Sequence, residues 1–352
     1  MNRADLLRLT KALAIGAVGG ALFFVLKMPL AWMMGAMVLS TIAALSGVSL
    51  YVPGRLRSAM VAILGVLLGS TFTPEAMQKV GEWPITLMSL ALYLLVVTGI
   101  LYVYFRRVMG FDPATAYFSA TPGGLNEMVI VGRAMGGDDR GIALVHGSRV
   151  LLVVLTLPFW FRYAYGVSSA GGGAGSGTLA GIGWLDGSLL VACAVFGPLI
   201  GKLLRLPAYR LVGPMLASAA VHLSGVTASA PPMELVAMAQ VVVGSAIGAR
   251  FVGAPLKWVF KIMASSVVST SLMLGATVGF ALALAPLTGL PFAAIVLAFS
   301  PGGLAEMSLI ALSLGIETAF VATHHVARIA MIVIAAPLVF RSVAKKKPPT
   351  SP

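Results

Sequence analysis

The chain is divided along its whole length into apolar stretches, most of them long enough to cross a lipid bilayer. A transmembrane helix needs about 17–25 mostly apolar residues. Only 10% of the 352 residues are charged, against roughly 25% in a typical soluble protein. The pattern predicts an all-α polytopic membrane protein. The candidate spans are residues 12–27, 30–50, 57–73, 84–105, 140–161, 179–201, 207–227, 232–249, 262–287 and 318–340.

The second half of the chain repeats the first. TPGGLNEM at residues 121–128 returns as SPGGLAEM at residues 300–307, and the ranges 121–162 and 300–341 align without a gap, so equivalent positions differ by 179. Two copies of one membrane unit are a recurrent plan among secondary transporters. We therefore predict an internal duplication with a first membrane repeat at 1–165, a Gly/Ser-rich linker at 166–178, a second repeat at 179–341 and a cytoplasmic tail at 342–352.

The paired PGGxxEM motifs and the twofold unit resemble the Gram-negative AbrB-type family of membrane proteins, whose members carry a duplicated AbrB unit. The resemblance covers nearly the whole chain. Members of that family are labelled ammonia monooxygenase, transport protein or regulator of gene expression. The resemblance therefore implies a polytopic inner-membrane protein more firmly than it implies any one activity. It does not extend to the soluble DNA-binding regulator that shares the family's name.

The Lys and Arg residues of the loops predict how the two PGG regions, 111–135 and 290–316, are folded. If both regions cross the membrane, the loops on the two sides carry 12 and 10 positive charges. If both enter and return as re-entrant hairpins, one side carries 19 and the other 3. Cytoplasmic loops are enriched in Lys and Arg, so the second arrangement is favoured. Each half then has five crossings and one hairpin, the repeats are inverted, and both termini are cytoplasmic.

The PGG motif is expected to start a half-helix inside the membrane. Proline lacks an N–H and glycine adopts backbone angles that other residues avoid, and such backbone at membrane depth must be enclosed by protein or line a wet cavity. If Thr121 and Ser300 are the N-caps, each Glu lies about six positions into its helix, and the free N–H groups favour an anion. The alternative is a tight turn with solvated glutamates. The candidate substrate or ion site contains Thr121, Gly123, Gly124, Asn126, Glu127, Ser300, Gly302, Gly303 and Glu306.

A His and an Arg spaced by three residues recur in both halves, and this spacing places them on one helix face. Both Arg lie within apolar spans, where a charge costs about 2.5–3.5 kcal/mol or more, so both need partners inside the protein. One interpretation is a structural pair with the nearby Glu. The other is an Arg that holds an anionic substrate group while Glu or His handles a coupling proton. We expect one central cluster of Glu127, Arg149, Glu306 and Arg328, with His146 and His325 at its edge.

The leading hypothesis is a secondary transporter of a small anionic solute in the bacterial inner membrane. It is not an enzyme, needs no cofactor or metal, and binds the lipid bilayer and a small solute or ion but no nucleic acid; a homodimer is a candidate assembly. One alternative is a membrane protein that regulates gene expression indirectly. A remote alternative is a membrane-bound monooxygenase, whose metal would need several converging ligands. His146, His324, His325 and the two Glu show no recognisable ligand spacing.

Overall fold

The computed structural model describes residues 2–165 and 178–344, and within these ranges it contains helices and no β-strand. The prediction of an all-α polytopic membrane protein is confirmed. The predicted linker, except Thr178, and the tail beyond residue 344 lie outside the described residues. The helices of the first half are α1 (Arg3–Val25), α2 (Ala31–Leu45), α3 (Gly54–Gly69), α4 (Pro74–Met77), η1 (Val80–Glu82), α5 (Trp83–Arg107), α6 (Pro113–Ala120), α7 (Leu125–Ala134) and α8 (Asp139–Tyr165).

The helices of the second half follow the same order. They are η2 (Leu179–Gly181), α9 (Trp184–Leu203), α10 (Tyr209–Leu223), α11 (Met233–Gly248), η3 (Ala249–Phe251), α12 (Leu256–Thr288), α13 (Phe292–Phe299), α14 (Leu304–Ser313) and α15 (Thr318–Ala344). Three pairs of equivalent helices have equal lengths, with 16 residues in α3 and α11, 8 in α6 and α13, and 10 in α7 and α14. The aligned segments therefore have the same local structure in both halves.

Seven helices of the described chain are long and apolar enough to cross a membrane. They correspond to seven of the ten expected spans. The other three, α2, α3 and α10, have 15, 16 and 15 residues. At about 1.5 Å per residue they reach roughly 22–24 Å, which is less than the ~30 Å hydrocarbon core.

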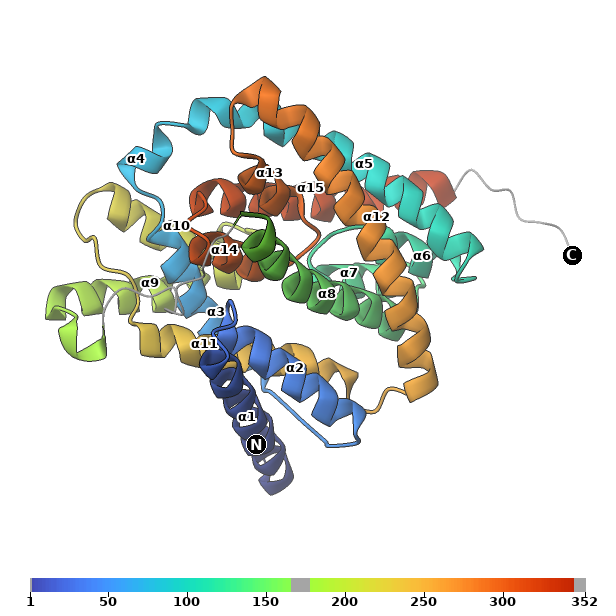
Figure 1. Cartoon of the computed structure of the whole chain (residues 1–352), viewed down its shortest axis with the longest axis horizontal. Coiled ribbons are helices and arrows are strands. Elements are labelled where there is room, and N and C mark those ends of the chain that lie inside the picture. Colours follow the sequence, from blue (N-terminus) through green and yellow to red (C-terminus); the bar gives the residue numbers. More distant parts are fainter. Residues whose placement is uncertain (1, 166–177, 345–352) are drawn as a thin grey trace, which may run out of the picture.

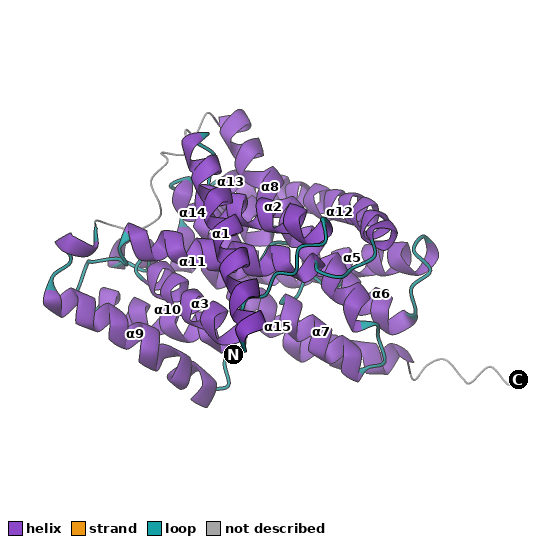
Figure 2. Ribbon diagram, turned by 90° about the horizontal axis from the view of Figure 1, so that it is seen from below, coloured by secondary structure: helices purple, strands orange, loops and turns teal. Residues whose placement is uncertain are grey.

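The helices form two blocks that lie side by side (Figures 1 and 2). The scaffold block consists of α1, α2, α3, α9, α10 and α11. In this block α11 of the second half packs on α1 and α2 of the first half. In the same way α3 of the first half packs on α9 and α10 of the second half. The hairpin block consists of α5–α8 and α12–α15, in which α12 packs on both α5 and α8. The two halves are therefore interlocked in both blocks.

Glycines allow the close helix contacts of the scaffold block. A Cβ at Gly65 would lie 2.5 Å from the carbonyl oxygen of Leu211, and one at Gly244 would lie 2.5 Å from the carbonyl oxygen of Met33. These are equivalent contacts, α3 on α10 and α11 on α2. Any larger side chain would push the helix pairs apart, as is usual for small residues in membrane helix interfaces.

The first PGG region folds back on itself as a helical hairpin. Thr115 near the start of α6 accepts a hydrogen bond at its Oγ1 from the backbone N–H of Asp138, just beyond the end of α7, at 2.7 Å. Gly132 of α7 also packs against Phe118 of α6. In the second region α13 and α14 contact each other, and both pack on α15.

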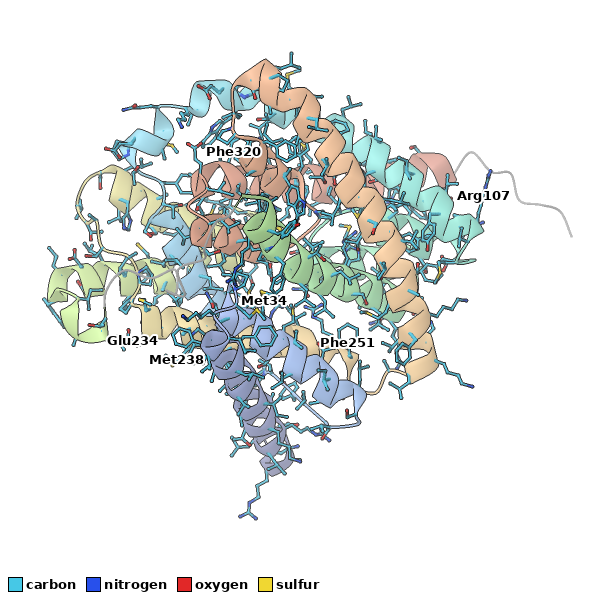
Figure 3. The ribbon with its side chains drawn as sticks, in the orientation of Figure 1. Met34, Arg107, Glu234, Met238, Phe251 and Phe320 are labelled. Atoms are coloured by element: carbon cyan, nitrogen blue, oxygen red, sulfur yellow. The ribbon has the colours of Figure 1, made fainter. Side chains whose placement is uncertain are left out.

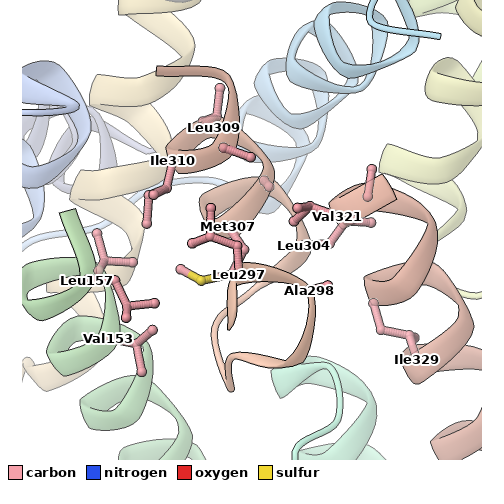
Figure 4. Packing of buried hydrophobic residues seen from close by; sticks show 14 of the residues in the cluster. Val153, Leu157, Leu297, Ala298, Leu304, Met307, Leu309, Ile310, Val321 and Ile329 are labelled. Atoms are coloured by element: carbon pink, nitrogen blue, oxygen red, sulfur yellow. The ribbon is translucent and has the colours of Figure 1, made fainter. Parts of the chain in front are cut away.

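Buried apolar side chains form one large core that joins the two blocks. Met34 of α2 and Phe320 of α15 are both fully buried members of this core, whereas Arg107 lies exposed at the end of α5 (Figure 3). Around the second hairpin, Val153 and Leu157 of α8 face Met307 and Leu297 (Figure 4). The second hairpin is thus embedded in apolar packing.

A candidate substrate cavity between the two blocks

A cavity of about 690 Å³ lies between the scaffold block and the hairpin block. Pockets for small molecules commonly have volumes of roughly 300–1,000 Å³. Its walls come from α3, α10, α11 and η3 on one side and from both PGG loops, α7, α8, α14 and α15 on the other. Asn126 and Arg210 line the cavity and are exposed, so the cavity opens to the surface of the protein at these two residues.

The half-helices begin three residues later than the sequence analysis expects. The N-caps are Gly124 and Gly303, whereas Thr121 and Ser300 end the preceding helices α6 and α13. The expected caps are therefore wrong. A residue that precedes proline is held in extended backbone, and both residues have it, with ψ angles of 122° and 142°. Their hydroxyls donate back to the carbonyls of Tyr117 and Val296.

This shift places each glutamate in the first turn of its helix, not about six positions into it. The side chain of Glu127 folds back over Gly124, where a Cβ would lie 2.2 Å from its Oε2; Glu306 lies over Gly303 in the same way, at 2.0 Å. A carboxylate is stabilised at a helix N-terminus. Each broken helix thus has an acidic side chain of its own over its N-terminus, and its free N–H groups are not simply open to a substrate.

The two histidines make equivalent contacts. His146 Nε2 lies 2.8 Å from the carbonyl oxygen of Phe118, and His325 Nε2 lies 3.0 Å from that of Leu297. The acceptors stand at equivalent positions, one on α6 and the other on α13. Each histidine therefore joins the long helix that follows the hairpin to the first helix of that hairpin.

The two arginines, by contrast, have different partners. Arg328 donates from Nη1 to the carbonyl of Ser300 and from Nη2 to the carbonyl of Gly302, both at 2.5 Å. These carbonyls lie at the end of α13 and in the PGG loop, where no helical N–H is available to them. Arg328 therefore holds the second broken loop in place.

Arg149 binds no carbonyl. Its Nη2 lies 2.5 Å from Nδ1 of His146, its Nη1 meets only the sulfur of Met273 at 3.8 Å, and its buried Nε has no partner. A thioether is a weak acceptor. Arg149 is nevertheless only 3% exposed and lines the cavity. It therefore offers the cavity a guanidinium whose hydrogen-bonding capacity is largely unused.

The contact with Arg149 also determines the state of His146. Because an arginine can only donate, Nδ1 of His146 must accept, so the ring is neutral and its proton lies on Nε2, facing the carbonyl of Phe118. A second proton on Nδ1 would break the bond to Arg149. Protonation of His146 and the orientation of Arg149 are therefore coupled.

The structural Glu–Arg pairs of the first interpretation are not formed among the described residues. The ion pairs of the described residues join Arg8 to Asp5 and Arg133 to Asp139. Thr121, Ser300 and His325 are buried but do not line the cavity. Ten of the thirteen expected site residues do line it: Gly123, Gly124, Asn126, Glu127, His146, Arg149, Gly302, Gly303, Glu306 and Arg328.

Three arginines of the cavity were not among the expected site residues. Arg57 of α3, Arg210 of α10 and Arg250 of η3 all line it, whereas the sequence analysis counted them as loop charges. A signal for them exists in the duplication, because a charged residue in one repeat stands opposite an uncharged one in the other. A related difference, a polar residue opposite an apolar one, occurs at Asn126, whose counterpart is Ala305.

The family model described as "Transition state regulatory protein AbrB" matches residues 9–344. The chain belongs to the AbrB family. Among curated relatives, the "Uncharacterized protein YhjN" of Bacillus subtilis (strain 168) is 26% identical over 356 residues, covering 94% of this chain and 91% of the relative. The "Putative regulator AbrB" of Escherichia coli (strain K12) is 27% identical over 337 residues, covering 94% of each chain. The cavity described above is therefore that of an AbrB-family membrane protein.

Proposed function

We propose that this AbrB-family protein is a secondary transporter of a small anionic solute. The observation that carries the proposal is Arg149, a buried arginine that lines the cavity with its Nε unpaired and its Nη1 on a thioether. An unpaired charge inside a membrane span is expensive, and such residues usually mark a substrate or ion pathway. The guanidinium fork matches a carboxylate or phosphate group.

The surrounding charge supports an anion. The cavity is lined by five arginines and two glutamates. Arg149 and Arg328 line the same cavity, and an anion bound between the blocks offsets their like charges. The glutamates occupy the two helix N-termini, so the solute binds to arginines and the carboxylates are left for a coupling proton or cation.

The position of the cavity supports a transport cycle. It lies between two blocks rather than inside one of them, so a rocking movement of one block against the other would change which side it faces. The proposed topology has ten crossings and two re-entrant hairpins in inverted repeats, with both termini in the cytoplasm of a bacterial cell. In that topology the mouth near Arg57, Arg210 and Arg250 faces the cytoplasm. The same proposal includes assembly as a homodimer. It also includes the absence of enzymatic activity and of nucleic-acid binding.

The transport function is tested with purified protein in proteoliposomes. Small organic and inorganic anions are screened for uptake, with and without a pH or sodium gradient. We expect saturable uptake of at least one anion that is abolished by Arg149→Gln and retained by Arg55→Gln, an exposed arginine outside the cavity. Uptake that the Arg149 variant leaves intact would contradict the role of this residue, and a failure of all anions would contradict the function.

The topology has its own test. Cys193 is free and buried, so Cys193→Ser provides a background for single exposed cysteines. We expect Arg140→Cys to be labelled from the cytoplasmic side and Lys79→Cys from the opposite side. Labelling of both from one side would remove the inverted repeat.

An indirect effect on gene expression remains the second candidate function, because a relative carries the name "Putative regulator AbrB". The two candidates differ in one experiment. If a transport-dead Arg149→Gln variant restores the expression phenotype of a deletion strain, signalling does not pass through transport. The monooxygenase alternative gains no support, since no group of three or more His, Cys, Asp or Glu able to hold a metal occurs in the described part of the chain.

A further inference from the structure

Three arginines, from α3, α10 and η3, line the same side of the cavity, and we call Arg57, Arg210 and Arg250 the mouth arginines because Arg210 is exposed there. Arg210 donates from Nη1 to Oγ of Ser58, the neighbour of Arg57, at 2.8 Å. Arg57 and Arg250 line the same cavity, and Arg250 Nη2 lies 3.5 Å from Oδ1 of Asn126. Arg57 Nε is buried without a partner. None of the three belongs to an ion pair of the described residues.

The mouth arginines are separate from the deep arginine pair. Arg149 of α8 and Arg328 of α15 line the cavity from the hairpin block, whereas the mouth arginines line it from α3, α10 and η3 on the other side. His146 of α8 also lines the cavity and is bonded through its Nδ1 to Arg149. One cavity therefore contains two cationic positions.

The mouth arginines also have no arginine at the equivalent positions of the other repeat. The positions equivalent to Arg57, Arg210 and Arg250 are occupied by Val236, Trp32 and Thr71. The deep pair, Arg149 and Arg328, is by contrast present in both halves. A general excess of cytoplasmic positive charge does not require three arginines to converge on a cavity wall, whereas a second anionic group of the solute does.

We propose that the solute carries two separated carboxylates, one bound by Arg149 and the other by the mouth arginines. The inference rests on the proposed transport function and names its substrate class as dicarboxylates. The guanidinium groups supply paired donors at each end, and the cavity of about 690 Å³ holds a short aliphatic dicarboxylate with room to spare. A single anion would leave the like charges of the mouth arginines without a counter-charge.

The test compares dicarboxylates with their monomethyl esters at pH 7.5, using calorimetric titration of the purified protein in detergent. The probes are malonate, succinate, glutarate and adipate, each paired with its own monoester, which removes one charge at almost constant size. We expect at least one dicarboxylate to bind about tenfold or more tightly than its ester, the effect of one lost charge-assisted hydrogen-bonding group. Arg57→Gln and Arg250→Gln should lower the affinity for the dicarboxylate to that of the ester and leave ester binding unchanged.

Arg55→Gln is the matched control, because Arg55 lies two residues before Arg57 on the same helix, is exposed and does not line the cavity. It should retain the preference for the dicarboxylate. Melting temperatures without ligand identify a variant that is merely unfolded, and Arg57→Lys, which keeps the charge, then replaces it and should retain part of the preference. Equal binding of acid and ester, or no binding of any of the four acids, overturns this inference. Uptake of a monovalent anion in proteoliposomes would then still support the transport function, whereas no anion uptake at all would contradict both.

Discussion

In the first hairpin the carbonyl of Thr121 accepts a hydrogen bond from the N–H of Gly123 inside its own loop, at 2.9 Å. In the second hairpin the equivalent carbonyl, that of Ser300, accepts from Arg328. The two hairpins have the same motif and the same helix lengths. Because the first loop satisfies its own carbonyl, Arg149 is free to face the cavity, whereas Arg328 is engaged. One copy of the duplicated arginine thus serves the fold and the other is available to a solute.

The two hairpins also differ in how deeply their second helices are buried. In α14 the residues from Leu304 to Ala311 are all buried, whereas in α7 only Met128 and Gly132 are. The apolar side chains around α14 include Val153 and Leu157 of α8 and Leu297 of α13 (Figure 4), and α14 also packs on α3. Because elements with little buried surface open more easily, we expect the second hairpin to be a fixed support and the first to move more freely. Each prediction below tests this difference between the hairpins.

The largest difference is expected for the two arginines. Arg328→Ala leaves two buried carbonyls without a donor, at about 1–3 kcal/mol each, so we expect a loss of about 2–6 kcal/mol in the free energy of unfolding. Arg149→Ala exposes no backbone group and removes a poorly paired charge, so its stability should stay within about 1 kcal/mol of wild type while uptake is lost. Thermal or denaturant unfolding in detergent, together with proteoliposome uptake, measures both. Equal destabilisation by the two variants would contradict the assigned roles.

The next difference concerns the N-cap glycines. Gly124 and Gly303 have φ angles of −63° and −78°, which alanine adopts without strain, so alanine tests only the added Cβ against the glutamate carboxylate. Glu127 is half-buried and can swing away, whereas Glu306 is 9% exposed. We expect Gly303→Ala to destabilise by about 1–3 kcal/mol, as overpacking does, and Gly124→Ala by less than about 0.5 kcal/mol. Thermal or denaturant unfolding of the two variants measures this difference. If Gly124→Ala were the more destabilising change, the first hairpin would be the confined one.

A smaller difference should appear in native-state hydrogen exchange. Elements with little buried surface open locally at low free energy. We expect the amides of α7 to exchange at least about tenfold faster than those of α14, which corresponds to about 1.4 kcal/mol. Mass spectrometry of the peptides that cover residues 125–134 and 304–313 measures this. Equal protection of the two segments would show that neither hairpin is the mobile one.

The sequence was sufficient for the fold class and for the polar residues that the two PGG regions and the His–Arg helices contribute to the cavity, but not for the wall formed by α3, α10, α11 and η3. Ten apolar stretches and a gapless repeat predicted the helices, because membrane spans have strong compositional signals. The position of the half-helix was missed by three residues, since Thr121 and Ser300 are favourable N-caps but each precedes a proline that keeps it extended. The partners of Arg149 and Arg328 could not be predicted, because the two halves have nearly identical motifs and differ in a loop hydrogen bond that no residue type determines.

The smallest effect is expected at Asn126. Within the motifs TPGGLNEM and SPGGLAEM, this is the position at which the two hairpins differ by more than a conservative exchange. Asn126 is exposed, and Arg250 Nη2 lies 3.5 Å from its Oδ1, at the limit of hydrogen bonding. Its counterpart, Ala305, is buried at 6% exposure. Asn126→Ala should change the free energy of unfolding by less than about 0.5 kcal/mol, as exposed substitutions usually do. Ala305→Asn should destabilise more, because a buried amide without a partner costs about 1–3 kcal/mol. Unfolding of both single variants tests the pair. If Asn126→Ala were the more damaging, the weak contact with Arg250 would be essential to the first hairpin, and that hairpin could not be the freer of the two.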